Sequence, residues 1–316
     1  MTQMKLNHNA SVVIQLSICY TIAITMFGDS LFIYYGYHGN DKAPSLTLHP
    51  KGENSFKSFS PRDKTFSLTF DTAQRFCTGW HDLATSESFP CPDNAQLPKQ
   101  FDHCRHCQNK TGFNPAFYHA ASVSPQQQAR NAQPHFLYIA HFAPGVIKVG
   151  ISWAERGISR LLDQGARSSL IIKTYPSATI ARQYEAKIAS LPDIAETLQV
   201  KAKHKFLGRI YDSQAAANEL LKTRHRLTKT FGMTPDDNNP IYLDSYYTGV
   251  PLQNPIILHD EHKISGNCIG MLGSTILMEQ DGQQFGLNLG DLTGYRMYMT
   301  SETEANKYQP QQVSLF

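Results

Sequence analysis

The stretch HFLYIAHFAPGVIKVGISW, residues 135–153, decides the fold of the central part of this chain. Phe136–Ala140 is a short apolar run, and Val146–Ile151 is a second one rich in β-branched side chains. Runs of this length and composition are typical of buried strands. Pro144 and Gly145 lie between them and favour a tight turn. The stretch therefore predicts a β-hairpin, on which the surrounding domain is expected to build.

Helices and a further strand are expected directly after this hairpin. Ser152 and Glu155 match a capping box, which predicts a helix over residues 152–162. The apolar run Leu170–Tyr175 predicts a third strand, and Ser177 is a suitable N-cap for a second helix. Together these elements predict an α+β fold with a small sheet and flanking helices.

The regions on either side of this domain have different patterns. Phe66, Leu68 and Phe70 alternate with polar residues, which is the period of half-buried strands. Glycines interrupt strand-like runs near the C-terminus, which favours a small twisted sheet or barrel. We expect 1–35 to be an uncertain apolar extension, 36–76 a β-rich N-terminal region, 77–134 a cysteine-rich zinc-binding module, 135–232 the α/β domain with a basic helical extension, 241–300 a glycine-rich β region and 301–316 a tail.

Composition places the chain among ordinary globular proteins. It has 316 residues, of which 41% are hydrophobic and 17% charged, so it can bury a core and fits two or three domains. The net charge of +3 is too small to identify a nucleic-acid partner unless the basic residues cluster. Such a cluster occurs at 201–230, where a solvated amphipathic helix and a surface for the phosphate backbone are equally good interpretations.

The N-terminal residues leave three interpretations open. Residues 11–27 are mostly apolar, but this run is short for a membrane span and lacks the flanking features of a signal peptide. It could be a non-native extension ahead of a start at Met26, a buried strand or helix, or a membrane anchor formed within residues 11–35. A membrane partner is not the expected one, but residues 11–35 leave it open.

Four of the six cysteines fall within one short window and predict a structural zinc site. Cys104 and Cys107 form a C-x-x-C knuckle, and Cys77 and Cys91 lie upstream. Four thiolates in a tetrahedron satisfy Zn²⁺ and leave no open coordination position. Six cysteines are too few for a disulfide scaffold in a chain of this length, so the quartet indicates a reducing compartment such as the cytoplasm. A histidine in place of one cysteine (His81, His103 or His106), a redox pair at the knuckle, and unligated thiols remain as alternatives.

The hairpin and the helices after it resemble the GIY-YIG nuclease domain. Tyr138 matches the tyrosine of the first motif, and Lys148-Val149-Gly150 falls on the second motif, with Lys148 where the second tyrosine would stand. Arg160 matches the arginine of the first helix, with Arg156 as a competitor, and Glu185 matches the metal-binding glutamate of a later helix.

A longer span, from about Tyr37 to Met299, resembles a bacterial and archaeal family of unknown function that pairs a cysteine motif with this domain. The pieces that carry this resemblance are Arg75-Phe76-Cys77, Cys104-x-x-Cys107, Lys148-Val149-Gly150-Ile151, Asp163-Gln164-Gly165-Ala166 and Gly294-Tyr295.

The GIY-YIG resemblance implies phosphodiester hydrolysis with Mg²⁺ or Mn²⁺, in which Tyr138, Lys148, Arg160 and Glu185 form the site. Each residue also has another interpretation: Tyr138 as a core residue, Lys148 as a solvated or phosphate-facing lysine, and Arg160 with Glu185 as an ion pair. The missing second tyrosine leaves three hypotheses. They are a DNA or RNA nuclease, a nucleic-acid binding module without catalysis, and a protein acting on a small anionic ligand such as a nucleotide.

Overall fold

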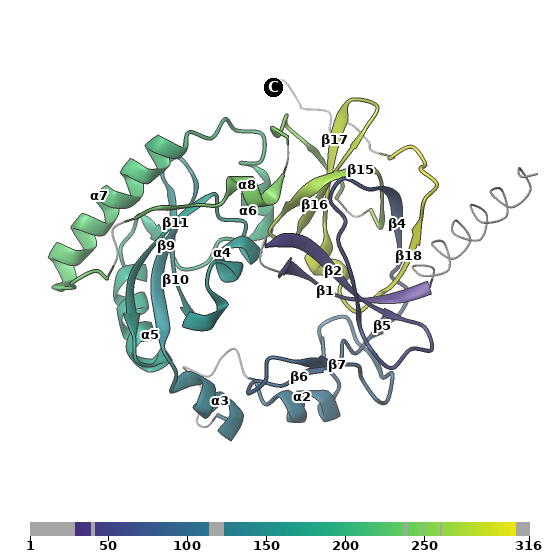
Figure 1. Cartoon of the computed structure of the whole chain (residues 1–316), viewed down its shortest axis with the longest axis horizontal. Helices are drawn as coiled ribbons and strands as arrows, with labels where there is room; N and C mark the ends of the chain where they lie inside the picture. The colour runs from purple at the N-terminus through teal and green to yellow at the C-terminus, as the bar shows by residue number, and fades with distance from the viewer. Residues whose placement is uncertain are drawn as a thin grey trace, which may run out of the picture.

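The computed structural model describes residues 29–38, 42–113, 123–236, 239–248, 250–259 and 261–307. Its described part is a mixed α+β protein, as expected, with two large sheets that lie side by side and a small cysteine-containing module below them (Figure 1). The expected apolar extension lies outside the described residues up to position 28, and its last residues belong to a strand. Among the described residues, no helix is long and apolar enough to cross a membrane.

The larger sheet joins the two ends of the chain. The expected alternation is confirmed, since Phe66, Leu68 and Phe70 are buried on one strand, β4. This strand pairs antiparallel with two strands from the C-terminal region. The N-terminal and glycine-rich regions, described separately above, therefore share one sheet. Its order is β14 (Ile256–Ile257), β17 (Gln283–Asn288), β16 (Thr275–Gln280), β15 (Lys263–Leu272), β4 (Thr65–Asp71), β18 (Arg296–Thr300), β1 (Asp29–His38), β2 (Ala43–Pro50) and β3 (Lys57–Phe59).

The smaller sheet contains the predicted hairpin. Strands β9 and β10 pair antiparallel and place Gly150 opposite Tyr138. Helices α5 (Ala178–Ala189) and α7 (Ser213–Phe231) pack on this sheet, and the Ser177 hydroxyl caps α5 by accepting from the Ile180 amide. The sheet order is β12 (Ile194–Ala195), β10 (Val146–Trp153), β9 (His135–Ala143), β11 (Ser168–Tyr175) and β13 (Ile241–Tyr242).

The predicted helix over residues 152–162 is wrong in its first half. Strand β10 continues to Trp153, because Ser152 pairs with Phe136 of β9 and is taken into the sheet. A single 3-10 turn, Ala154–Arg156, follows, and Gly157 with φ of 50° interrupts it. The helix proper, α4, covers only Ser159–Asp163.

Strand β9 is buried along its whole length and separates two cores. Phe136, Tyr138, Ala140 and Phe142 belong to a core that includes residues of the nine-stranded sheet. The alternate side chains Leu137 and Ile139 face a second core, and its other members come from the rest of the small sheet and from the two helices (Ile147, Val149, Leu170, Ile188, Leu220).

The cysteine-containing module is built from short ladders and helices. Its attachment to the large sheet is made by the Phe76 amide, which donates to the Gly294 carbonyl at 2.7 Å. A Cβ on Gly294 would lie 2.7 Å from the Phe76 carbonyl oxygen, so this close approach requires glycine. The module contains β5 (Arg75–Phe76), β6 (Trp80–His81), β7 (Ser88–Phe89), β8 (Gln96–Leu97), α2 (Arg105–Thr111) and α3 (Pro125–Asn131).

Because β4 joins the two ends of the chain, Leu68→Ala should destabilise the whole fold. Leu68 is fully buried, so we expect a loss of about 2–5 kcal/mol in the free energy of unfolding. Thr69→Ala on the exposed face of the same strand is the control and should change stability by less than about 0.5 kcal/mol. Chemical denaturation measures both, and equal small effects would contradict a shared sheet.

Candidate functional site

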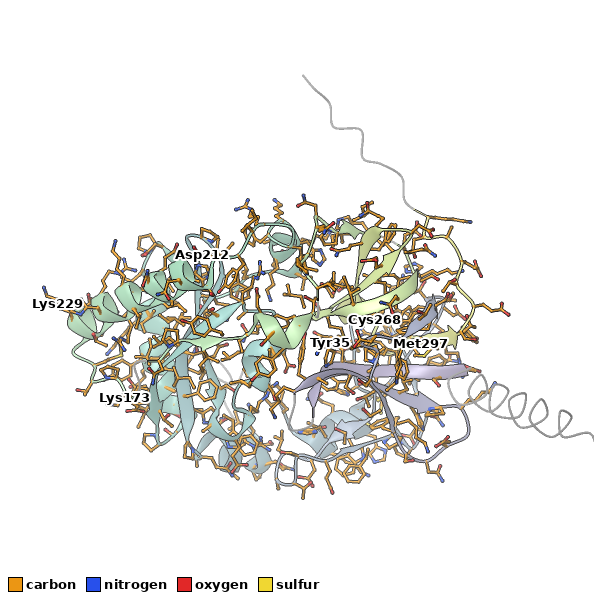
Figure 2. The ribbon with its side chains drawn as sticks, turned by 45° about the horizontal axis from the view of Figure 1, so that its top comes forward. Tyr35, Lys173, Asp212, Lys229, Cys268 and Met297 are labelled. Atoms are coloured by element: carbon orange, nitrogen blue, oxygen red, sulfur yellow. The ribbon has the colours of Figure 1, made fainter. Side chains whose placement is uncertain are left out.

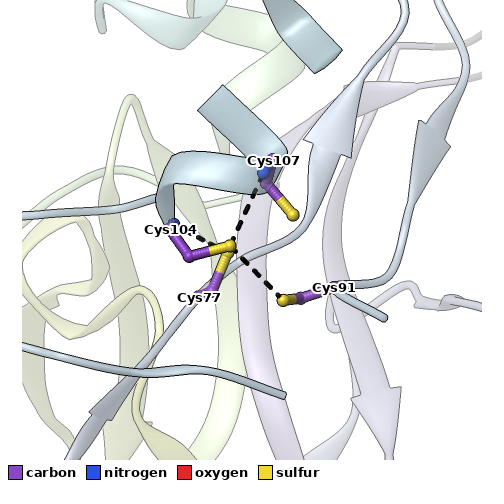
Figure 3. Close-up of side chains that lie close together, drawn as sticks. All are labelled: Cys77, Cys91, Cys104 and Cys107. Carbon is purple, nitrogen blue, oxygen red and sulfur yellow. Dashed lines mark hydrogen bonds between the residues drawn. The ribbon is translucent and has the colours of Figure 1, made fainter. Parts of the chain in front are cut away.

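The four predicted cysteines converge in the structure on one point. Cys77 and Cys91 follow short strands, Cys104 is the N-cap of α2 and Cys107 lies in its first turn. Their ligand atoms all lie within 4.8 Å of one another (Figure 3), and the Cys91 and Cys104 sulfurs are 3.8 Å apart. A zinc tetrahedron with Zn–S bonds of about 2.3 Å has edges of about 3.8 Å. The quartet therefore has the dimensions of a closed four-sulfur metal site.

The surroundings of the sulfurs fit metal-bound thiolates. The Cys104 amide donates to the Cys77 sulfur at 3.2 Å, and the Cys107 amide donates to the Cys104 sulfur at 3.5 Å. Without a metal, burial raises the pKa of the Cys77 thiol to about 11. A bound cation would reverse this effect and hold the sulfurs as thiolates. Unligated thiols packed this closely would gain little from their arrangement.

The histidine alternatives are not brought into the quartet. In the described chain, the group of metal-ligating side chains contains four cysteines and no histidine. The His103 ring contacts the Gly79 carbonyl at 2.8 Å, and the His106 ring contacts Asp93 at 3.1 Å. The fifth described cysteine, Cys268, is a buried residue of the large sheet.

Of the residues that match the GIY-YIG motifs, Tyr138 lies on the face of the small sheet that packs against α4, whereas Glu185 comes from α5. The Tyr138 ring lies over Gly150, where an added Cβ would be 2.5 Å from the ring carbon Cζ. The Tyr138 hydroxyl accepts from the side-chain amide of Gln164, and it also contacts Arg160. Burial raises the pKa of Tyr138, so its hydroxyl keeps its proton. Because any larger residue at position 150 would collide with the ring, this position of Tyr138 requires Gly150.

Three cations lie near one another beside Tyr138. The Lys148 ammonium lies 6.0 Å from the centre of the Tyr138 ring, and Lys203 of α6 (Val200–His204) donates to the Gln164 carbonyl at 2.6 Å. Burial and the Arg160 charge together lower the pKa of Lys148 to about 8, although the Glu185 and Glu196 charges act in the opposite direction. Burial, Lys148 and Arg160 likewise lower the pKa of Lys203 to about 8. We call Lys148, Arg160 and Lys203 the cation cluster.

Glu185 lies near this cluster but is paired elsewhere. It is 6% exposed and lies among the buried residues of α5. Its Oε2 accepts from Arg182 at 2.5 Å, and the same guanidinium contacts Glu196 at 2.5 Å. Among the ion pairs of the described residues, Glu185 is therefore paired with Arg182, and the suggested pair with Arg160 is absent.

Two residues of this neighbourhood were not among the predicted site residues. Lys203 was noted only as part of the basic stretch, because its distance from Arg160 in the sequence gives no sign of their proximity. Gln164 is 8% exposed and belongs to the Asp163–Ala166 stretch quoted above. Within the described residues its Oε1 atom is buried and lacks a hydrogen-bond partner. A polar side chain buried in this way indicates a place where a ligand or solvent group completes the site.

The quartet gives a direct test of metal binding. Purified protein should contain about one zinc per chain, and Cys107→Ser should lose the metal because it removes the fully buried ligand. Chelation should lower the melting temperature of the wild type. Cys268→Ala, which removes a buried cysteine outside the quartet, should keep the metal. Elemental analysis that finds far less than one zinc in the wild type would contradict the site.

Comparison with known proteins gives one match. No curated protein and no solved structure matches the chain. A family model described as "Protein of unknown function (DUF2797)" matches residues 64–297. This range includes the cysteine quartet, the two strands of the β9–β10 hairpin and most of the large sheet. The expected membership of a family of unknown function is thus confirmed: the chain belongs to the DUF2797 family.

Proposed function

We propose that this protein binds nucleic acid by holding a backbone phosphate at the cation cluster, with the cysteine quartet as a structural zinc site. The observation that carries the proposal is the charge of the cluster. Among the described residues, none of Lys148, Arg160 and Lys203 has an ion pair within 4.0 Å. Half-buried cations that lower one another's proton affinity favour an anionic ligand, because the ligand removes their mutual repulsion.

The surface next to the cluster suits a polymer. Lys201, Lys205 and Arg209 are exposed and lie on α6 or just after it, beside Lys203. Exposed cations close to the cluster in sequence would suit a nucleic-acid backbone with its repeated phosphates. The rest of the basic stretch differs: Arg226 is paired with Asp193, and Lys229 lies at the far end of α7 (Figure 2). That part of α7 fits the solvated amphipathic helix weighed above.

Metal-dependent cleavage of the bound strand is a second candidate function. The GIY-YIG resemblance suggests it, and the Tyr138 hydroxyl is within electrostatic range of both Arg160 and Glu185, which supports it. Two features weigh against a divalent ion. Glu185 is already bound to Arg182, and the surrounding cations repel Mg²⁺ or Mn²⁺ unless phosphate oxygens supply further ligands. We therefore place phosphate binding first. The thiol-rich module supports a cytoplasmic location.

Phosphate binding at the cluster predicts a specific pattern of affinity losses. Lys148→Ala and Lys203→Ala should each weaken binding of an oligonucleotide about tenfold at fixed salt, because each removes one charge-assisted contact. Arg226→Ala, which removes a basic residue already paired with Asp193, should have little effect. Fluorescence anisotropy measures all three variants.

The same proposal predicts a pH dependence. Both lysines have pKa values lowered to about 8, and only the protonated amine attracts phosphate. Affinity should therefore be full near pH 6.5 and fall as the pH rises through 8. An affinity that does not change with pH in this range would contradict the proposal. So would an equal loss of affinity in Arg226→Ala and Lys148→Ala.

For the cleavage function, the discriminating variant is Glu185→Gln. With Mn²⁺ present, we expect it to cut labelled DNA or RNA about a hundredfold more slowly than the wild type while it still binds the strand. Glu196→Gln is the matched control, because it alters the other carboxylate bound to Arg182. Equal cleavage by wild type and Glu185→Gln would remove Glu185 from the reaction. If the wild type binds the strand but does not cut it, only the binding function remains.

A further inference from the structure

A cavity that is open to solvent is lined by α8 (Asp244–Tyr247), by the segment after it and by the end of β15. It has a volume of about 260 Å³. Sites for drug-sized molecules occupy about 300–1,000 Å³, so a somewhat smaller group would fill this one. Part of its wall is apolar and reaches the surface, where Val250 is 41% exposed. This apolar part consists of Val250, Pro251, Leu252 and Leu272.

Contacts between α8 and its neighbours hold the cavity in shape. The Tyr247 hydroxyl donates to the Ala166 carbonyl at 2.6 Å, and Thr248 forms an isolated bridge with Gly270 of β15. A Cβ on Gly270 would lie 1.9 Å from the Tyr247 carbonyl oxygen, so this close approach requires glycine. A cavity whose wall is fixed in advance loses little conformational freedom when a ligand enters.

The polar groups of the lining suit a neutral ligand group better than a second phosphate. Arg167 donates to both carboxylate oxygens of Asp244, at 2.7 and 2.6 Å, so its charge is already compensated. The Thr248 hydroxyl donates to the Val250 carbonyl at 2.7 Å and can still accept a hydrogen bond. An apolar wall with a few hydrogen-bonding groups fits a nucleobase, which has apolar faces and polar edges.

The cavity is next to Lys203 of the cation cluster. A smaller cavity shares Arg167, Leu252 and Leu272 with it and is also lined by Lys203. The link along the chain is equally short, since Lys203 donates to the Gln164 carbonyl at 2.6 Å and Arg167 lies three positions after Gln164. The Cα atoms of Gln164 and Arg167 are therefore at most about 11 Å apart. A strand whose phosphate is held at Lys203 would have the cavity within reach of a nearby base.

We propose that this cavity is a base-binding subsite, in which a nucleotide next to the phosphate held at the cation cluster buries its base. The inference rests on the proposed phosphate binding and adds the class of ligand, a strand that is unpaired at this position. A paired base is closed on its edge by its partner and on its faces by its neighbours, so it would have to leave the duplex to enter.

The first test needs only the wild type. Fluorescence anisotropy at pH 7 and fixed salt compares a single-stranded oligonucleotide with an abasic strand of the same length, which keeps every phosphate and lacks the bases. The wild type should bind the intact strand at least about tenfold more tightly, because a buried base adds contacts that the backbone does not supply. Since the phosphates are the same in both strands, equal affinities would overturn the inference.

A second test, Leu252→Trp, addresses the cavity itself. The larger side chain would fill the cavity, so this variant should bind the intact strand about tenfold more weakly than the wild type and the abasic strand equally well. Ile180→Trp is the control, since Ile180 is 37% exposed on α5 and should leave both affinities unchanged. An unchanged affinity of Leu252→Trp for the intact strand would also overturn the inference.

Lys148→Ala separates this inference from the proposed function. It should weaken binding of both strands by the same factor, because it removes a phosphate contact. If the wild type binds the two strands equally and Lys148→Ala weakens both, the base subsite is wrong and phosphate binding stands. If the wild type binds neither strand, both proposals fail.

Discussion

The burial of β9 on both faces is the constraint on which the arrangement of this molecule depends. One face of the strand belongs to the core beneath α5 and α7, and the other belongs to the core shared with the nine-stranded sheet. Tyr138 lies on the second face, so any site built around it must lie where the two sheets meet. This explains why Lys203, distant in the sequence, lies close to Lys148 of the hairpin and to Arg160.

The electrostatics of this junction are unusual for a folded core. Half-buried cations are costly unless paired, and mutual repulsion adds to the cost. The structure offsets part of it through local carbonyl groups: Lys148 donates to the Val149 carbonyl at 3.0 Å, and Lys203 to the Gln164 carbonyl. The nearby carboxylates of Glu185 and Glu196 instead form ion pairs with Arg182. Glu185 and Glu196 still act on Lys148 through their charges, but the described lysines of the cluster have no direct ion pair, and this leaves them able to attract an external anion.

Local patterns predicted much of this structure, and long-range pairing accounts for what they missed. The hairpin and the capping of α5 by Ser177 both follow from residues near one another in the sequence. The capping box at Ser152 failed because pairing with Phe136 competes with helix formation there. The union of β4 with β15 and β18 joins segments from opposite ends of the chain, and no local periodicity indicates which strands pair. Lys203 was missed for the same reason, whereas cysteine spacing was sufficient for the quartet.

The most direct test of the cation cluster is NMR titration of the lysine side chains after ¹³C-methylation. The account predicts that two signals, lost in Lys148→Arg and Lys203→Arg respectively, titrate near pH 8, well below the ordinary value of 10.5. Adding a short single-stranded oligonucleotide should move both midpoints upward by about one unit or more, because a bound phosphate stabilises the charged amines. If both lysines titrate above pH 10, or if the oligonucleotide leaves their midpoints unchanged, the proposed phosphate site is wrong.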